Sequence, residues 1–264
     1  MDTSNRSVKT ALITGASSGI GYEIAKVFAR EGYNLVLVAR DKGRLSQLAD
    51  ELKERFGLSV KVIPKDLSVG TSAQEIYDEF GRESVKIDVL VNNAGLIVYG
   101  NFHETDLSKE LQMIQVNLVS LTQLTKLFLK DMVKEGHGKI LNVGSTGSFA
   151  PGPLNAVYCA TKAYVLSLSE ALAEELKGSG VTVTALCPGA TTTELQKKAQ
   201  MDDIRYLRNR MDARTVAEIG YRGLMAGKRV VVPGVYNRLQ ILSVRFTPRN
   251  VVTRMVKFVM ERDK

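Results

Sequence analysis

Short apolar runs alternate along the chain with longer segments in which apolar residues recur every three to four positions. The short runs, rich in Val, Ile and Leu, lie at residues 9–14, 34–39, 59–63, 89–92, 139–143, 181–186 and 229–232. Such continuous apolar character is typical of parallel strands that are covered on both faces. The longer segments predict helices over residues 20–31, 43–56, 71–80, 109–134, 156–177 and 213–226. Repeated strand–helix–strand units predict an α/β fold with one doubly wound, seven-stranded parallel sheet flanked by helices.

The C-terminal segment departs from this alternation. Thr247-Pro248 has the residue types of a helix cap followed by a first helical residue. Apolar residues then recur at helical spacing, at Val251, Val252, Met255, Phe258 and Val259. We therefore expect a C-terminal helical extension whose apolar stripe packs on its own domain or on another subunit. Because basic residues are interleaved with the stripe, a membrane surface is the alternative partner.

Composition limits the class of protein. At 264 residues, with 44% hydrophobic and 24% charged residues, the chain can form one large α/β core and is typical of soluble globular proteins. The two cysteines, Cys159 and Cys187, and the two histidines, His103 and His137, lack metal-ligand spacing, so no metal is expected. The polar N-terminus has no leader-type apolar core, and no apolar run reaches the roughly 18 residues of a spanning helix. A cytoplasmic location is therefore expected.

The net charge of +8 is concentrated towards the C-terminal end. Residues 201–264 carry 14 basic and 6 acidic side chains, whereas residues 1–200 carry 22 of each. This excess fits a solvated basic face, and it also fits weak contact with a membrane surface or an acidic partner. Nucleic acid is not expected as a partner, because no recognition motif accompanies the charge.

Tyr158 and Lys162 are four residues apart in a predicted helix and therefore share one face. An unperturbed tyrosine, with a pKa of about 10, is a poor base at neutral pH. A neighbouring ammonium group lowers that pKa, which makes the pair a candidate for general acid–base catalysis. Ser145 lies thirteen residues before Tyr158 and is a candidate for holding the oxygen of a carbonyl or alcohol beside the phenol.

A glycine-rich turn follows the first predicted strand and opens the first predicted helix. Gly15 allows the chain to leave the strand, Gly19 lets a phosphate approach the backbone, and Gly21 allows close packing of helix on sheet. Amide groups at the start of the helix are then placed to bind the pyrophosphate of a dinucleotide. The residues of this turn expected to contact it are Gly15, Ser17, Ser18, Gly19 and Ile20.

The end of the second predicted strand indicates which dinucleotide is bound. An acidic residue there would bind a ribose 2′-hydroxyl and repel a 2′-phosphate. This chain has the neutral Ala39 followed by Arg40. A guanidinium group suits a phosphate through paired, charge-assisted hydrogen bonds. The sequence therefore predicts NADP(H) rather than NAD(H), unless Arg40 simply points to solvent.

With these motifs placed, the chain resembles the short-chain dehydrogenase/reductase family over about residues 8–235, and within it the NADP(H)-preferring bacterial oxidoreductases. The matching positions, in the family's order and spacing, are 14–21, Asp66-Leu67, 92–95, Asn117, Ser145, Tyr158, Lys162 and Pro188-Gly189. The resemblance implies a single Rossmann domain over residues 1–264. Its parts are a core at 8–235, a substrate loop at 190–214 and a basic C-terminal extension at 236–264.

The resemblance also implies roles for individual residues. The implied catalytic residues are Asn117, Ser145, Tyr158 and Lys162. Asn117 would disrupt the ladder of its helix and bind a water that joins Lys162 to solvent and restores the proton on Tyr158. Further cofactor contacts are implied for Asp66, Leu67, Asn93, Ala94, Gly95, Tyr158, Lys162, Pro188, Gly189, Thr191 and Thr193.

The implied activity is hydride transfer between NADP(H) and the carbonyl or alcohol of an apolar small molecule, with Tyr158 as general acid/base. Leu96, Val98, Phe149 and Leu154 are expected to line the substrate pocket. One alternative is a 3-oxoacyl reductase whose basic tail docks an acidic carrier, and another is an NADPH-binding sensor without turnover. The family resemblance further implies a homo-oligomer, dimer or tetramer, paired through the helices at 109–134 and 156–177.

Overall fold

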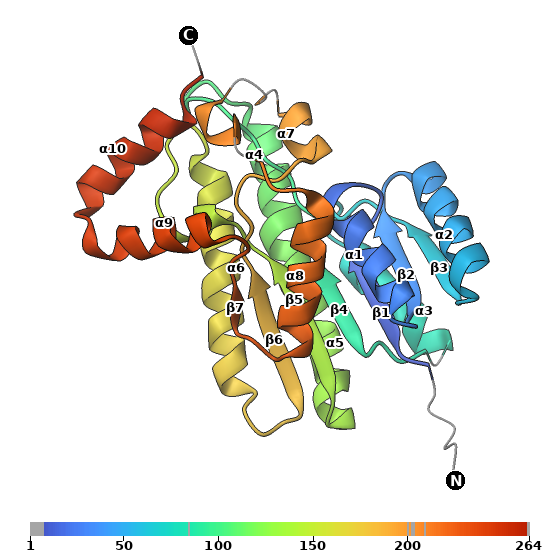
Figure 1. Ribbon diagram of the computed structural model, residues 1–264. Helices are drawn as coiled ribbons and strands as arrows, with labels where there is room; N and C mark the ends of the chain where they lie inside the picture. The colour runs from blue at the N-terminus through green and yellow to red at the C-terminus, as the bar shows by residue number, and fades with distance from the viewer. Residues whose placement is uncertain (1–7, 84, 200, 202–203, 209, 263–264) are drawn as a thin grey trace.

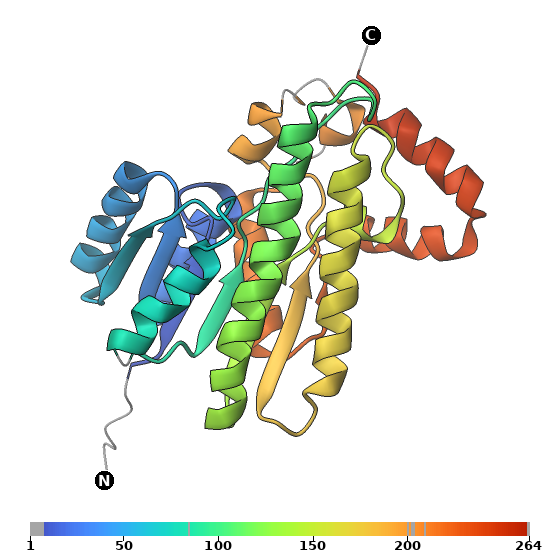
Figure 2. The same ribbon diagram turned by 180° about the vertical axis from the view of Figure 1, so that it is seen from behind.

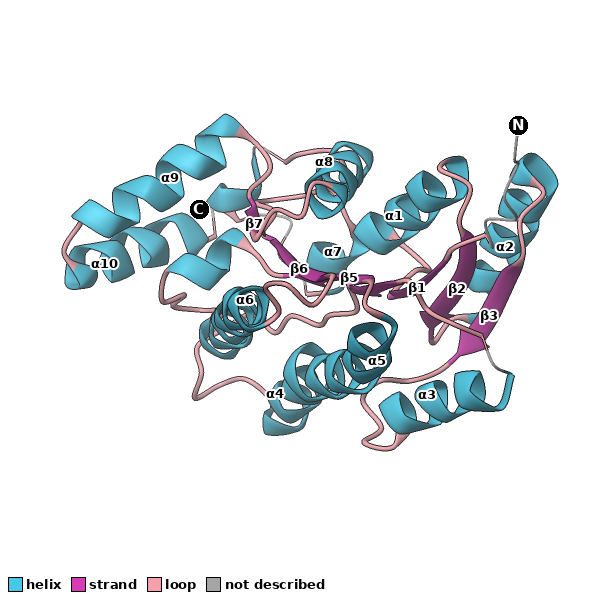
Figure 3. Ribbon diagram, turned by 90° about the horizontal axis from the view of Figure 1, so that it is seen from below, coloured by secondary structure: helices cyan, strands magenta, loops and turns pink. Residues whose placement is uncertain are grey.

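A seven-stranded parallel sheet forms the centre of the molecule (Figure 3). The computed structural model describes residues 8–83, 85–199, 201, 204–208 and 210–262. The sheet order is β3-β2-β1-β4-β5-β6-β7, and every neighbouring pair is parallel. The strands are β1 (Thr10–Thr14), β2 (Asn34–Ala39), β3 (Val60–Pro64), β4 (Val89–Asn92), β5 (Gly138–Val143), β6 (Val181–Leu186) and β7 (Val230–Val231). This confirms the predicted sheet, although β7 is shorter than its apolar run.

Helices cover both faces of the sheet (Figure 3). One face carries α1 (Gly19–Arg30), α2 (Lys42–Phe56) and α8 (Ala213–Met225). The other carries α3 (Ser72–Glu83), α4 (Leu107–Ile114), α5 (Leu121–Glu135) and α6 (Ala156–Glu175). Seen from behind, α5 and α6 lie side by side across this second face, in green and yellow (Figure 2). The two helical layers are the arrangement expected of a doubly wound sheet.

The strands bury their side chains alternately on the two faces. In β1, Ala11 and Ile13 join the apolar core beneath α1, α2 and α8, while Leu12 joins the core beneath α3 and α5. In β2, Leu35 and Leu37 face the first core and Val36 and Val38 the second. Because both faces are covered, nearly every strand position is apolar, which explains the continuous apolar runs in the sequence.

The helix expected over residues 109–134 is not one regular α-helix. Between α4 and α5 the backbone forms a π-helical turn, η1 (Gln115–Ser120), with Asn117 buried inside it. A π-helical turn in a long helix is a local break of the α-helical ladder, the kind of disruption expected at Asn117.

The C-terminal extension contains two helices, of which only the second was predicted. α9 (Val235–Phe246) and α10 (Arg249–Met260) project from the body as a hairpin, seen in red at the left of Figure 1. We call residues 235–260 the α9–α10 hairpin. Shorter helical turns lie at η2 (Thr146–Phe149), α7 (Glu194–Lys198) and η3 (Arg205–Arg208). Among the described residues, no helix has the length and apolar character needed to cross a membrane.

Candidate active site

A cavity of about 280 Å³ lies at the carboxyl ends of the strands, around the point where the sheet order reverses between β1 and β4. This crevice is where open α/β sheets bind ligands. Of the residues predicted from the sequence to bind a cofactor or to act in catalysis, all but Asn117 line this one cavity. They are Gly15, Ser17, Ser18, Gly19, Ile20, Arg40, Asp66, Leu67, Asn93, Ala94, Gly95, Ser145, Tyr158, Lys162, Pro188, Gly189, Thr191 and Thr193.

The glycine-rich turn between β1 and α1 is packed tightly against the end of β4. Gly15 adopts the left-handed conformation, with φ +67°, and a Cβ there would lie 2.7 Å from Asn93 Nδ2. A Cβ on Gly21 would overlap both Asn93 and the Gly15 carbonyl oxygen. The Asn93 amide in turn donates to the carbonyl oxygens of Thr14, at 2.9 Å, and Gly15, at 3.2 Å. Any side chain at position 15 or 21 would therefore push the turn away from the strand ends.

The N-terminus of α1 points into the cavity with its amide groups available. Ser18 precedes the helix in an extended conformation, and among the described residues its side chain makes no capping hydrogen bond. Unused amides at a helix N-terminus bind phosphate, and hydroxyl groups from Ser17, Thr191 and Thr193 line the same end. The helix amides and the Ser17 hydroxyl fit the pyrophosphate of a dinucleotide, whereas the hydroxyls of Thr191 and Thr193 already donate to the Gly189 carbonyl oxygen and to Gln196 Oε1.

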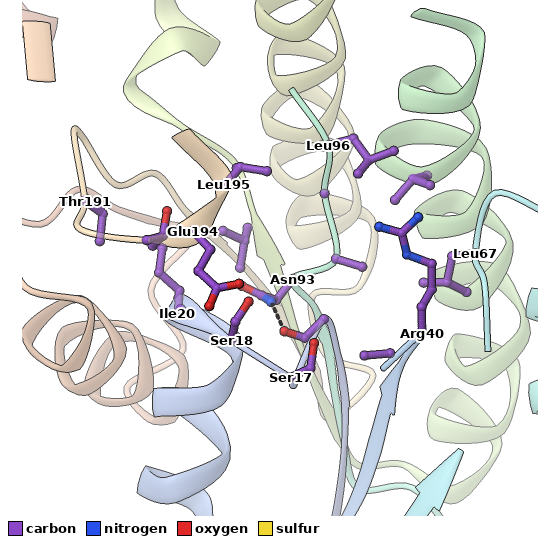
Figure 4. A pocket seen from close by; sticks show the side chains of 18 of the residues that line it. Ser17, Ser18, Ile20, Arg40, Leu67, Asn93, Leu96, Thr191, Glu194 and Leu195 are labelled. Carbon is purple, nitrogen blue, oxygen red and sulfur yellow. Dashed lines mark hydrogen bonds between the residues drawn. The ribbon is translucent and has the colours of Figure 1, made fainter. Parts of the chain in front are cut away.

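A carboxylate from the substrate loop points towards this same end. Glu194, at the start of α7, reaches towards Ser18 (Figure 4). The Arg44 guanidinium holds it, with Nη1 at 2.7 Å and 2.8 Å from the two Glu194 carboxylate oxygens. The substrate loop and α2 are thus joined across the mouth of the cavity. Sequence reasoning did not find this contact, because 150 residues separate the two side chains.

The other end of the cavity, beside β2 and β3, is basic. Arg40 follows the end of β2 (Figure 4). Its guanidinium lies 4.0 Å from a carboxylate oxygen of Asp66. Arg44 and Lys65 also line this end, and both were missed from the sequence because neither belongs to a recognised motif. Asp41 lies between Arg40 and Arg44 in the chain, and its carboxylate caps α2 by accepting from the Arg44 amide at 3.0 Å.

Ser145, Tyr158 and Lys162 meet where β5 ends. Ser145 caps η2, with its hydroxyl accepting from the Gly147 amide at 3.0 Å. Tyr158 and Lys162 lie on successive turns of α6, and the Lys162 Nζ is 5.8 Å from the centre of the Tyr158 ring. The buried ammonium group donates to the Val143 carbonyl oxygen at 2.8 Å. The structure therefore brings the three side chains to one wall of the cavity, as expected from their spacing.

The pKa values of Tyr158 and Lys162 differ from those expected from the sequence. Burial raises the pKa of Tyr158, and the Ser145 hydroxyl lowers it only in part by hydrogen bonding. Burial also lowers the pKa of Lys162 from 10.5 to about 8. The expectation that Lys162 lowers the pKa of Tyr158 overall is therefore wrong for the protein without a bound cofactor. Burial disfavours the charged phenolate more strongly than the Lys162 ammonium, which donates to the Val143 carbonyl oxygen, favours it. Tyr158 is accordingly protonated at neutral pH, the form that a proton donor needs.

Asn117 lies behind the cavity wall rather than in it. Its Oδ1 accepts from the Leu96 amide at 2.7 Å, and its Nδ2 donates to the Leu96 carbonyl oxygen at 2.9 Å and to the Thr161 hydroxyl at 3.2 Å. Gly95 separates it from the cavity, and a Cβ on Gly95 would lie 3.4 Å from Asn117 Oδ1 and 3.5 Å from Lys162 Nζ. Asn117 therefore fixes the segment that faces Lys162.

An apolar cluster that includes part of the C-terminal extension, which we call the roof, adjoins the cavity, since its member Ala190 lies between the cavity residues Gly189 and Thr191. Its buried members are Ala190, Met201, Ile204 and Met260, and Tyr99, Leu154, Val256 and Val259 pack against them. The predicted wall residue Leu96 lines the cavity and Leu154 joins the roof. Phe149 is a correction: it packs against Leu166, Ala185 and Cys187 and lines a different cavity beneath the α9–α10 hairpin. Its helical turn, η2, directs the ring away from the dinucleotide cavity.

Tyr206 connects this roof to the segment that carries Ser145. Its hydroxyl lies 2.6 Å from the Thr146 hydroxyl, next to Ser145 in the chain. Burial raises the pKa of Tyr206, and the hydrogen bond with Thr146 lowers it in part. Sequence reasoning placed residue 206 in the substrate loop but gave no reason to single it out.

Comparison with known proteins agrees with this geometry. The sequence profile of the short chain dehydrogenase family matches residues 9–203. The very-long-chain 3-oxoacyl-CoA reductase of Anas platyrhynchos is 36% identical over 193 residues, which are 71% of this chain and 61% of that protein. The matched part thus spans less than two thirds of that relative.

Two solved structures resemble the whole body of the chain. A short-chain dehydrogenase from Sphingobium yanoikuyae, in complex with NADPH, is 36% identical with a TM-score of 0.82, covering 90% of this chain and 93% of that one. The bulky-bulky ketone specific alcohol dehydrogenase from Comamonas testosteroni is 35% identical with a TM-score of 0.78, covering 90% and 92%. The protein therefore belongs to the short-chain dehydrogenase family of nicotinamide-dependent oxidoreductases.

Proposed function

We propose that the protein is an NADP(H)-dependent oxidoreductase that interconverts a carbonyl and an alcohol on an apolar substrate. The observation that carries the proposal is the shared cavity. Ser145, Tyr158 and Lys162 form one wall of it, and the glycine-rich turn and Arg40 line other parts of the same cavity. An intact proton donor beside a dinucleotide-shaped site favours turnover over a binding-only sensor.

The side chains of the proposed active site have different roles in the reduction. NADPH, when bound along this cavity, supplies the hydride for the carbonyl carbon. Ser145 orients the carbonyl oxygen, and Tyr158 donates a proton to it as negative charge develops there. Lys162, buried and fixed on the Val143 carbonyl oxygen, places positive charge beneath the Tyr158 ring and so favours the phenolate left after proton transfer. Asn117 positions the backbone in front of Lys162.

The preference for the phosphorylated dinucleotide rests on the basic end of the cavity. Arg40, Arg44 and Lys65 place three cations around the end of β2, where Ala39 is neutral. Arg44 is paired with Glu194 and Lys65 with Glu75, so Arg40, whose nearest carboxylate oxygen is 4.0 Å away, is the cation most open to a phosphate. Charge-assisted hydrogen bonds would stabilise the 2′-phosphate of NADPH there. NADH has no 2′-phosphate and would not gain these bonds.

Replacing Arg40 with Asp should therefore reverse the cofactor preference. We expect the ratio of kcat/KM with NADPH to kcat/KM with NADH to fall by about 10²-fold or more, since charge-assisted bonds are lost and a repulsive charge is gained. Steady-state kinetics with both cofactors measures the ratio. Arg55→Asp, an exposed change at the far end of α2, is the matched control and should leave the ratio unaltered. An unaltered ratio in the Arg40 variant would discredit the assignment.

The substrate class follows from the apolar roof. Leu96, Leu154 and the cluster around Met201 and Met260 suit a hydrophobic group attached to the carbonyl carbon. The ketone named for the Comamonas testosteroni structure and the acyl chain named for the Anas platyrhynchos relative are both compatible with such a roof.

Tyr206 is expected to hold this roof closed. Tyr206→Phe removes its hydrogen bond to Thr146, worth about 0.5–1.5 kcal/mol, so the KM for the carbonyl compound should rise several-fold while the Kd for NADPH stays unchanged. Steady-state kinetics and fluorescence titration separate the two constants. Tyr22→Phe, which loses only a surface bond to Glu51, is the control. An unchanged KM in Tyr206→Phe would show that the bond serves stability alone.

Reduction of a 3-oxoacyl chain is the second candidate, favoured by the relative named as a 3-oxoacyl-CoA reductase and by the basic C-terminal extension. A panel of ketones, aldehydes and 3-oxoacyl thioesters, monitored by NADPH absorbance at low and high salt, decides between the two. A sharp loss of kcat/KM with salt, confined to carrier-bound thioesters, favours the second candidate. No oxidation of NADPH with any carbonyl compound would refute both.

The remaining expectations belong to the same proposal. We place the protein in a reducing, cytoplasmic compartment, which its two unpaired cysteines suit. Residues 1–264 would act as one domain and pair with further copies through α4–α5 and α6, as dimer or tetramer. No nucleic acid and no metal take part, in keeping with the small-molecule chemistry of the family.

A further inference from the structure

The α9–α10 hairpin exposes apolar side chains where a helix on a protein surface normally exposes polar ones. In α9, Val235, Leu239, Leu242 and Phe246 recur at helical spacing on the side facing solvent, and Phe246 is 82% exposed. No residue of α9, all of which are described, is buried. The side of α9 that faces the body carries half-buried Asn237 and Gln240 beside Ile241 and Val244. The solvent-facing side of α9 is thus more apolar than the side that contacts the body.

The second helix of the hairpin repeats this arrangement. Val252 and Met260 of α10 are buried towards the body, whereas Val251, Met255 and Phe258 are exposed. Met255 is 60% exposed. Exposed apolar side chains grouped at helical spacing on both helices of the hairpin mark a site of contact with another apolar surface.

Cations flank the exposed apolar side chains on both helices. Arg238 and Arg245 lie beside the stripe of α9, and Arg254 and Lys257 lie beside that of α10, all exposed. Glu261 is the single acidic residue described between positions 235 and 262. The hairpin therefore joins an apolar stripe to a positive border, a combination that suits the interface of a bilayer with anionic headgroups.

The excess of cations makes an anionic surface a better match for the hairpin than a second copy of this chain. A two-fold interface brings the same surface of each subunit together, so both sides of such an interface would carry the same excess of positive charge. Such like-charge contact opposes association. A bilayer surface accepts both the leucine and phenylalanine side chains and the arginine and lysine groups at its edge.

We propose that the α9–α10 hairpin docks the protein on the surface of membranes that contain anionic lipids. The apolar stripes enter the headgroup region and the flanking cations bind the anionic headgroups. A cavity of about 650 Å³ lies between the hairpin and α6, lined by Phe149, Ala160, Val244 and Val252, so the hairpin stands off the body rather than packing flat on it.

Vesicle flotation with the full-length protein tests the proposal. We expect binding to phosphatidylcholine vesicles that contain phosphatidylserine, much weaker binding to pure phosphatidylcholine, and release as the Debye length shrinks from about 10 Å to about 3 Å between 0.1 M and 1 M salt. Each Arg→Gln change at Arg238 or Arg245 should lower the partition coefficient about fivefold. Leu242→Ser with Phe246→Ser should lower it about tenfold or more.

Matched controls separate docking from general stickiness. Lys53→Gln with Arg55→Gln removes two exposed cations from α2, and Phe102→Ser with Leu107→Ser removes two exposed apolar side chains outside the hairpin. Both controls should bind vesicles like the unmodified protein. Circular dichroism melts verify that every variant is folded.

Three outcomes would overturn the proposal. In the first, anionic vesicles do not retain the unmodified protein, and in the second, the hairpin variants and the control variants bind equally well. Alternatively, sedimentation shows that Leu242→Ser with Phe246→Ser dissociates an oligomer while vesicle binding is unaffected. That last result would assign the hairpin to contact between copies. Because lipid binding needs no turnover, none of these outcomes depends on whether the proposed reaction is correct.

Discussion

Tyr158→Phe should lower kcat by about 10³-fold, in the middle of the range for loss of a general acid, with the Kd for NADPH largely unchanged. The phenyl ring keeps its place on α6 above Lys162, so the shape of the cavity is preserved. Only the hydroxyl is lost, and with it the proton that the reduced carbonyl oxygen needs. Single-turnover measurement of NADPH oxidation and a fluorescence titration of NADPH test the two halves of this expectation.

Tyr164→Phe is the matched control for this experiment. Tyr164 lies six residues further along α6, and its hydroxyl is 2.9 Å from the Thr122 hydroxyl, away from the dinucleotide cavity. This variant should keep nearly full turnover. Near-normal turnover in Tyr158→Phe itself would show that another group delivers the proton, and the proposed chemistry would then lose its basis.

Asn117→Ala should destabilise the fold by about 3–5 kcal/mol, because it leaves the Leu96 amide and carbonyl without their partner and removes the bond donated to the Thr161 hydroxyl, which keeps only its own bond to the Tyr158 carbonyl oxygen. For a chain of this size, that loss corresponds to a fall in Tm of roughly 5–9 °C. The segment 95–96 borders Lys162, so kcat should fall as well. Urea unfolding and steady-state kinetics measure the two effects.

Two further variants show whether the effect belongs to the Asn117 amide. Gln112→Ala removes a partly buried amide on α4 whose bond to Ser68 is long, at 3.3 Å, and should cost little stability. Asn117→Asp keeps an acceptor for the Leu96 amide but sets a carboxylate against the Leu96 carbonyl oxygen, so it should not restore stability. An Asn117→Ala protein that unfolds at the same urea concentration as the original would contradict this account.

The sheet and the dinucleotide end of the cavity were predictable because local pattern and tertiary structure agree there. Strands buried on both faces give continuous apolar runs in the sequence. The turn admits no side chain at Gly15 or Gly21, so it requires glycine there, and both features can be recognised from the residue types. Tyr158, Lys162 and Ser145 converge because they follow β5 and open α6 at the carboxyl edge of the sheet.

Features that depend on contacts distant in sequence were not predictable. α9 was missed although Val235, Leu239, Leu242 and Phe246 recur at helical spacing in the sequence; that this stripe faces solvent is a property of the folded chain that the spacing does not report. Arg44 takes part in the cavity through a partner on the distant substrate loop, which no spacing rule reports. The raised pKa of Tyr158 comes from the burial of the whole site, whereas the sequence shows only the neighbouring cation.

The Arg44–Glu194 ion pair has a consequence for the order in which ligands enter. It spans the mouth of the dinucleotide crevice, and its carboxylate belongs to the segment that continues into the roof at Met201, Ile204 and Tyr206. A nucleotide phosphate that takes Arg44 would release Glu194 and with it the start of that roof. We therefore expect an ordered sequential mechanism, in which the nicotinamide dinucleotide binds first and its oxidised form is released last.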